Sequence, residues 1–126
     1  MLVQDSNAKE TGKRGEDIAA EFLKKKGYKI LTRNWRPGMK GAANLELDIV
    51  ARKGEDTVFV EVKALSRDDL FLPEDHFTAP KARRVRTAAR LWLAENGFEA
   101  VPWQVDLIAV VIRGEYPDIR HYERVA

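Results

Sequence analysis

Residues 45–64 read LELDIVARKGEDTVFVEVKA. The stretch holds two short runs rich in apolar and β-branched residues, 45–51 and 57–64, separated by polar residues around Gly54. Two such runs joined by a short connection with a central glycine are typical of a β-hairpin. We therefore predict two antiparallel strands with the turn centred between Gly54 and Glu55.

Charged side chains share one face of this predicted hairpin. Because side chains alternate across a strand, Glu46 and Asp48 lie on one face of the first run, and Glu61 and Lys63 lie together on the second. The predicted turn places Asp48 opposite Glu61, and Glu46 opposite Lys63. Two opposed carboxylates repel unless a cation or a proton lies between them. The pattern favours a divalent metal with oxygen ligands, Mg²⁺ or Mn²⁺.

Lys63 would serve such a metal site in one of two ways. It would orient or deprotonate an attacking water, or it would neutralise charge that builds on a phosphate in the transition state. The alternative, from the charges alone, is a solvated sheet face. On that face Glu46 and Lys63 form a cross-strand ion pair, and Asp48 and Glu61 are merely hydrated.

A helix is predicted before the hairpin, and it carries a further carboxylate. Apolar residues recur at helical spacing over residues 8–26, and Gly27 supplies a C-terminal stop. Glu16 shares a helix face with Gly12 and Leu23, so we expect it to point towards the sheet. The alternative is an acid near the helix start that interacts with the helix dipole or a neighbouring lysine.

The remaining elements follow from apolar runs and from the positions of Pro and Gly. We predict strands over 28–35, 101–112 and 118–125, a loop over 36–44, a connection over 66–79, and a second helix from Pro80 to about Gly97. At 126 residues the chain fits one domain, 1–126, in which we expect residues 1–7 to be disordered.

Composition limits the class of protein. The chain is 44% apolar and 33% charged, and it contains no cysteine, so disulfides, thiolate zinc sites and cysteine nucleophiles are excluded. The sequence lacks a secretory signal and an apolar run of bilayer length, so we expect a soluble cytoplasmic protein without membrane contact. The net charge of +2 does not by itself identify a nucleic-acid partner.

The ordered residues Asp48 and Glu61-Val62-Lys63 resemble the PD-(D/E)XK nuclease superfamily, whose site is an Asp followed by Glu-X-Lys on the next strand. Segments 12–36 (GKRGEDIAAEFLKKKGYKILTRNWR), 45–51 (LELDIVA) and 58–64 (VFVEVKA) are similar to the bacterial YraN family of uncharacterised nuclease-like proteins. The resemblance implies a restriction-endonuclease-like α/β fold, similar to that of archaeal Holliday junction resolvases. This fold is a three-layer α/β/α core in the order α-β-β-β-α-β-β, with a central mixed β-sheet flanked by helices.

The resemblance also implies which residues form the site. The residues that match the family's three metal-associated acids and its catalytic lysine are Glu16, Asp48, Glu61 and Lys63. Asp106 corresponds to a recurrent Asp of unclear role in the family. The chain has Leu45 where the family usually has Gly, and Leu65 where it usually has Arg. These departures affect the expected substrate contacts more than the metal site.

The predicted second helix carries dense positive charge. No acidic residue occurs between positions 81 and 90, while Val85, Ala89 and Trp92 trace an apolar stripe. Because Lys and Arg supply most sequence-independent affinity for phosphates, we predict a DNA-backbone surface here. Its basic residues are Lys81, Arg83, Arg84, Arg86 and Arg90, with Arg33, Arg36 and Lys40 assisting. The alternative is a solvated helix face that offsets the acidic residues between 68 and 75.

Aromatic and histidine residues add little to the site. Trp92 is predicted to be core, and Trp35 and Trp103 are expected to be core more often than base-stacking residues. His76 and His121 have no partner at metal-ligand spacing, so we interpret both as surface or loop residues.

Two hypotheses for function follow from the sequence, and a third is kept open. The first is a nucleic-acid-binding protein that acts as a Mg²⁺- or Mn²⁺-dependent phosphodiester hydrolase on DNA, including branched or repair intermediates. The second is a binding module with the same fold and no turnover. The third is a protein-interaction domain, which would be favoured if a partner covered residues 81–90. A homodimer would suit an enzyme that cuts two strands.

Overall fold

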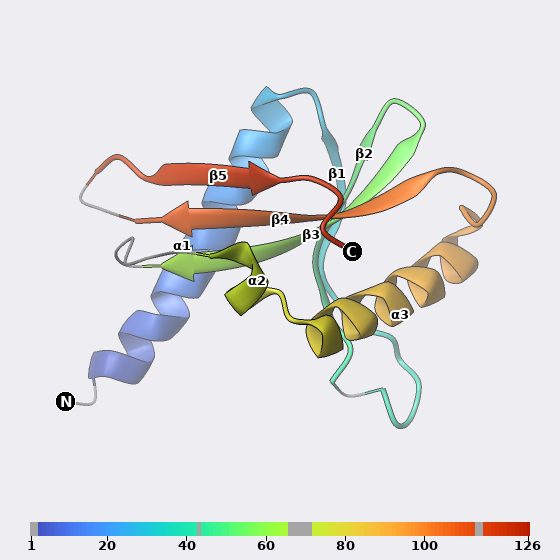
Figure 1. The fold of residues 1–126 in the computed structure, drawn as a ribbon, viewed down its shortest axis with the longest axis horizontal. Helices are drawn as coiled ribbons and strands as arrows, with labels where there is room; N and C mark the ends of the chain where they lie inside the picture. Colours follow the sequence, from blue (N-terminus) through green and yellow to red (C-terminus); the bar gives the residue numbers. More distant parts are fainter. Residues whose placement is uncertain (1–2, 43, 66–71, 113–114) are drawn as a thin grey trace.

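The computed structural model describes residues 3–42, 44–65, 72–112 and 115–126 (Figure 1). Its helices are α1 (Val3–Lys25), α2 (Pro73–His76) and α3 (Ala79–Asn96). Its strands are β1 (Lys29–Trp35), β2 (Leu47–Lys53), β3 (Asp56–Leu65), β4 (Trp103–Val111) and β5 (Asp118–Tyr122). The predicted order of elements is confirmed. The structure adds one short helix, α2, within residues 66–79, which were predicted to be a connection.

The described strands form one mixed sheet in the order β1-β2-β3-β4-β5. Neighbouring strands run antiparallel except β3 and β4, which are parallel and are therefore joined by the crossover that contains α3. β2 and β3 lie near the middle of the sheet, so side chains on both of their faces are buried over Leu47–Ala51 and Thr57–Val60. Asp48, near the start of β2, is consequently buried beside the core.

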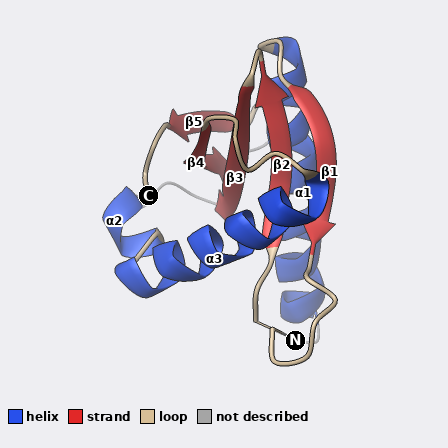
Figure 2. Cartoon of the chain, turned by 90° about the vertical axis from the view of Figure 1, so that its right-hand side faces the viewer, coloured by secondary structure: helices blue, strands red, loops and turns tan. Residues whose placement is uncertain are grey.

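Helices cover the two faces of the sheet, as Figure 2 shows for α1 and α3. Leu23 of α1 packs with Val58 and Val60 on one face. Trp92 of α3 packs with Phe59 on the other, with ring centroids 5.8 Å apart and a near-perpendicular arrangement. The predicted three-layer α/β/α core is therefore confirmed. None of the helices in the described part of the chain is long and apolar enough to span a membrane.

The hairpin has the predicted register. Gly54 has a φ of 63°, a conformation that suits a two-residue turn between paired strands. The ladder runs from Lys53 opposite Asp56 to Ile49 opposite Val60, so one further step places Asp48 level with Glu61. The position of Gly54 in the sequence was sufficient to predict that Asp48 lies level with Glu61.

α1 approaches β3 most closely at Gly15. A Cβ atom added there would lie 2.6 Å from the Cβ of Ala64, whereas one added at Gly12 would meet nothing within 4 Å. The small residue that permits the close approach is therefore Gly15. Gly15 directly precedes Glu16, so this contact fixes where Glu16 lies relative to β3.

The first helix is longer than predicted. α1 begins at Val3 and not near Ala8, although it ends at Lys25, close to the predicted stop. The prediction of disorder for residues 1–7 falls partly on residues 1–2, which lie outside the described residues.

Candidate functional site

Asp48 lies where the regular pairing of β2 and β3 ends. It is 8% exposed, and its Oδ2 accepts a 2.9 Å hydrogen bond from the backbone N–H of Val62. The last ladder pair is Ile49 with Val60. The Asp48 carboxylate therefore accepts a hydrogen bond from a backbone N–H that lies beyond the ladder. Asp48 is on the same strand face as Val50, which packs against the α3 side of the sheet.

The electrostatic surroundings of Asp48 disfavour its charged form. Burial is the main cause and the neighbouring Glu61 carboxylate the second, and together with Glu16 and Glu46 they raise the pKa of Asp48 to about 8. The hydrogen bond from Val62 opposes the shift. Without a cation, Asp48 therefore holds a proton at neutral pH.

Glu61 already has a cation beside it. Its side chain is 12% exposed, and its Oε2 lies 2.6 Å from the Nζ of Lys81 at the start of α3. From the sequence, Lys81 was predicted to belong to a DNA-binding surface, with no link to Glu61. Nothing in the local sequence signals this contact, because it depends on how α3 crosses the end of β3.

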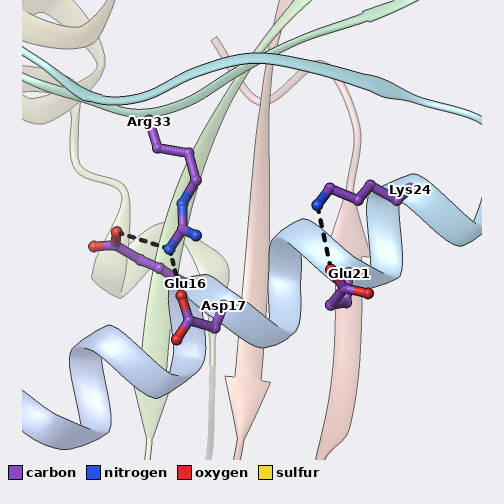
Figure 3. Close-up of polar contacts among 5 residues, drawn as sticks. All are labelled: Glu16, Asp17, Glu21, Lys24 and Arg33. Atoms are coloured by element: carbon purple, nitrogen blue, oxygen red, sulfur yellow. Dashed lines mark hydrogen bonds and ion pairs between the residues drawn. The ribbon is translucent and has the colours of Figure 1, made fainter.

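Glu16 belongs to the helix on the opposite face, yet its charge contributes to the raised pKa of Asp48. Figure 3 shows Arg33 of β1 between Glu16 and Asp17, with Nη2 3.8 Å from Oε1 of Glu16 and 2.7 Å from Oδ1 of Asp17. Burial raises the pKa of Glu16, while a hydrogen bond with Asn34 and the charge of Arg33 oppose that shift. Glu16 thus points towards the sheet, as predicted.

Glu46 takes a different partner from the one considered in the sequence. It lies just before β2, and its Oε2 is 2.5 Å from Nη2 of Arg36. The cross-strand ion pair of Glu46 with Lys63 is therefore replaced by a contact with Arg36. The physical reason is that Glu46 is outside the strand, so the alternation that would place it opposite Lys63 no longer applies.

Lys63 lies two residues after Glu61 on β3, where it is half-buried and level with Ala109 of β4. Strand alternation places it on the same side of the sheet as Glu61. The structure thus brings Asp48 beside Glu61 at the end of the hairpin and puts Lys63 on the strand face of Glu61. Glu16 approaches from α1, near enough to act on Asp48 through its charge.

A hollow of about 260 Å³ opens at this end of the sheet. Acidic and basic side chains meet in it. Its lining residues are Arg36, Asn44, Glu46, Glu61, Lys81, Arg84 and Val85. The hollow therefore places Glu61 of the candidate site beside the first turns of the cationic helix.

The basic face predicted for α3 is present. Arg83, Arg84, Arg86 and Arg90 are exposed, and the guanidinium of Arg90 lies 5.9 Å from the ring centroid of Trp103. All three tryptophans belong to the core cluster on the α3 side of the sheet. Trp92 is buried within this cluster, and Trp35 and Trp103 are partly buried against it. The assignment of Trp92 to the core is confirmed.

The donor set suits a hard divalent cation, although the side chains are arranged around other partners. In the part of the chain that the structure describes, no three His, Asp or Glu side chains lie close enough together to hold a metal ion. Glu61 is turned to Lys81, and Glu16 faces Arg33. A metal at Asp48 and Glu61 would therefore require Glu61 to exchange Lys81 for the ion, while the raised pKa of Asp48 shows a carboxylate that a cation would stabilise.

Asp106 and His121 form a separate buried cluster. Asp106 is 0% exposed, and its Oδ2 lies 2.7 Å from Nε2 of His121, whose side chain is 6% exposed. The Oδ1 of Asp106 accepts hydrogen bonds from the Gln104 side chain at 2.9 Å and the Arg124 backbone at 3.1 Å. The interpretation of His121 as a surface or loop residue was wrong, because β5 turns it inward onto Asp106.

The fold and the site together define a three-layer α/β/α protein with an acidic pair at the end of its β2–β3 hairpin. The chain belongs to the uncharacterised protein family UPF0102, called YraN above, whose profile matches residues 15–110. The match spans all four predicted site residues and Asp106. The family is uncharacterised, so membership brings no activity with it.

Relatives from several bacteria match most of the chain. A UPF0102 protein of Renibacterium salmoninarum is 41% identical over 113 residues, which is 89% of this chain and 92% of that protein. One from Thermotoga neapolitana is 41% identical over 108 residues, covering 86% and 90%. One from Carboxydothermus hydrogenoformans is 34% identical over 119 residues, covering 94% and 97%.

Proposed function

We propose that this protein is a metal-dependent nuclease that hydrolyses phosphodiester bonds in DNA. The observation that carries the proposal is the buried Asp48 level with Glu61, with the pKa of Asp48 raised to about 8. Like charges held together in a poorly solvated position disfavour the folded state unless a cation or a proton compensates. Oxygen ligands of this kind suit Mg²⁺ or Mn²⁺.

Each acidic residue has a role in this account. Asp48 and Glu61 would hold the ion, and Glu16, which faces Arg33 in this structure, would have to turn from it to supply a third carboxylate from α1. Bound there, Mg²⁺ or Mn²⁺ would acidify a water and offset the charge of a phosphate. Val62 keeps the Asp48 side chain in one orientation through its backbone N–H, which reduces the freedom that Asp48 loses on binding.

Lys63 acts on the reacting groups next to these acids. It either takes a proton from, or orients, the attacking water, or it neutralises the charge that develops on the phosphate. Its position two residues after Glu61 places it on the same strand face as that carboxylate.

The exposed arginines of α3 supply the DNA-backbone surface. The hollow that contains Glu61 is also lined by Arg36 and Arg84, so a phosphate bound there would lie beside Glu61. Branched DNA and repair intermediates are the substrates to test first, because the resemblance extends to Holliday junction resolvases.

A second candidate is a nucleic-acid-binding module without turnover. The observation that favours it is the ion pair of Lys81 with Glu61, since a protein that never binds metal would still need to neutralise this carboxylate. On that reading the basic surface binds DNA, and Asp48 stays protonated.

A cleavage assay separates the two candidates. Labelled branched, nicked and single-stranded DNA is incubated with wild type, Asp48→Asn and Lys63→Ala in Mg²⁺ or Mn²⁺. The nuclease proposal predicts cleavage by wild type, a loss of at least about 100-fold in both variants, and unchanged DNA affinity. Retained DNA binding with no cleavage of any substrate would support the binding module, and thermal unfolding checks that both variants fold.

A further inference from the structure

We propose that Lys81 is an internal counter-ion that competes with the metal for Glu61 and that a metal ion displaces from it. The inference rests on the proposed metal site and names the residue that controls its occupancy. Lys81 was assigned from sequence to DNA binding alone, and the contact with Glu61 gives it a second role.

The contact is close and partly shielded from water. Nζ of Lys81 lies 2.6 Å from Oε2 of Glu61, and the Glu61 side chain is 12% exposed against 36% for Lys81. Reduced exposure weakens solvent screening, so this pair is stronger than an ion pair on an open surface. The ammonium therefore lies against a Glu61 carboxylate oxygen that a metal ion could otherwise bind.

The position of Lys81 is fixed by the start of α3. The helix begins at Ala79 with Pro80 in its first turn, and the N–H of Ala82 donates to the carbonyl of Thr78 at 2.8 Å. Lys81 thus leaves the backbone in the first turn of α3, within reach of Glu61 on β3. The positive end of the α3 dipole adds to the attraction for the Glu61 carboxylate.

Displacement is favourable because the released ammonium has a new partner nearby. Lys81 lines the same hollow as Arg84 and Arg36, where a DNA phosphate would be bound. Glu61 and the phosphate therefore compete for Lys81, so phosphate binding frees Glu61 for the metal. By linkage, DNA binding then raises the affinity for the metal and metal binding raises the affinity for DNA, and Lys81 is the residue that couples the two.

The test is isothermal titration of Mn²⁺ into the full-length protein without DNA, at pH 8, comparing wild type with Lys81→Met. Removing the competing ammonium is expected to tighten Mn²⁺ binding about three- to tenfold. Lys81→Arg keeps the charge and is expected to retain the affinity of wild type within about twofold. Arg84→Met removes one positive charge from the same hollow, and it is expected to change the affinity by less than about twofold.

The outcomes separate this inference from the proposed function. If wild type, Lys81→Met and Lys81→Arg all bind Mn²⁺ equally, the metal site stands and the role of Lys81 is wrong. An equal gain in Lys81→Met and Arg84→Met also overturns it, because the effect would then be general charge repulsion. No Mn²⁺ binding by any folded variant rejects the metal site itself. Should Lys81→Met melt early, Lys81→Gln gives the same comparison.

Discussion

The carboxylate of Asp48 accepts a 2.9 Å hydrogen bond from the backbone N–H of Val62, one step beyond the last ladder pair of β2 and β3. This bond holds the acid in a buried position at which Glu61 also acts on it. The strand pair therefore ends in an acidic site where hydrogen bonding to Val62 favours the ionised form and burial opposes it. On the proposed function, a cation bound beside Asp48 and Glu61 would relieve this opposition.

Asp48 makes the metal-free protein less stable as the pH rises. Its pKa is about 8 in the folded state against an ordinary value of 3.8, so the folded state binds more protons between these values. Stability therefore falls as pH increases through this window. Asp48→Asn keeps a hydrogen-bond acceptor for Val62 and removes the titration, so at pH 8.5 it is expected to be about 1–3 kcal/mol more stable than wild type.

Urea unfolding at pH 4 and pH 8.5 measures this difference, which is expected to shrink at the lower pH. The exposed Glu55→Gln is the control, with an expected change of less than about 0.5 kcal/mol at both values. Equal destabilisation of Asp48→Asn at both pH values would contradict the electrostatic account.

The Gly15 contact predicts a large difference between two glycines of the same helix. Gly15→Ala places a methyl group 2.6 Å from the Cβ of Ala64 and is expected to destabilise the fold by about 1–3 kcal/mol. Gly12→Ala meets nothing within 4 Å, and it is expected to stabilise the helix by about 0.5–1 kcal/mol. Chemical denaturation of both variants provides the measurement, and equal effects would mean that α1 is not fixed at Gly15.

Asp106 is expected to support the fold and not the metal site. Asp106→Ala leaves the partners His121, Gln104 and the Arg124 backbone without their acceptor and is expected to cost at least about 2 kcal/mol. Glu123→Ala is the matched control, because Glu123 also accepts from Gln104 but is exposed. The Mn²⁺ affinity of both folded variants is expected to stay within about twofold of wild type. A loss of about tenfold in Asp106→Ala would instead assign Asp106 to the metal site.

The basic face of α3 predicts a salt-dependent effect on DNA binding. Arg86→Ala is expected to weaken DNA of any sequence similarly and to lower the slope of log affinity against log salt by about 1. Lys24→Ala on α1, whose side chain pairs with Glu21 3.3 Å away, removes the same charge elsewhere and is expected to have little effect. Fluorescence anisotropy at several salt concentrations makes the comparison, and matching slopes for all three proteins would remove α3 from the interface.

The sequence was sufficient to predict the hairpin because its determinants are local. Gly54 sets the turn, the turn sets the register, and the register brings Asp48 level with Glu61. The apolar stripe of α3 was predicted for the same reason, since helical periodicity alone identifies Trp92 as core.

Contacts between elements distant in the chain could not be predicted in this way. The pairing of Lys81 with Glu61 depends on the crossing of α3 over β3, and that of His121 with Asp106 depends on β5 adding to the edge of the sheet. A single charged residue or histidine carries no local signal of such a partner. Glu46 shows the remaining source of error, because β2 begins two residues after the start of the predicted run, which leaves Glu46 outside the strand and beside Arg36.

The most direct test of the central claim is isothermal titration of Mn²⁺ into wild type and Asp48→Asn, with and without a short DNA duplex. The account predicts that wild type binds Mn²⁺, more tightly when DNA is present, and that Asp48→Asn loses at least about tenfold in affinity. Absence of Mn²⁺ binding by wild type even with DNA, or equal binding by both proteins, would contradict a metal centre at Asp48 and Glu61.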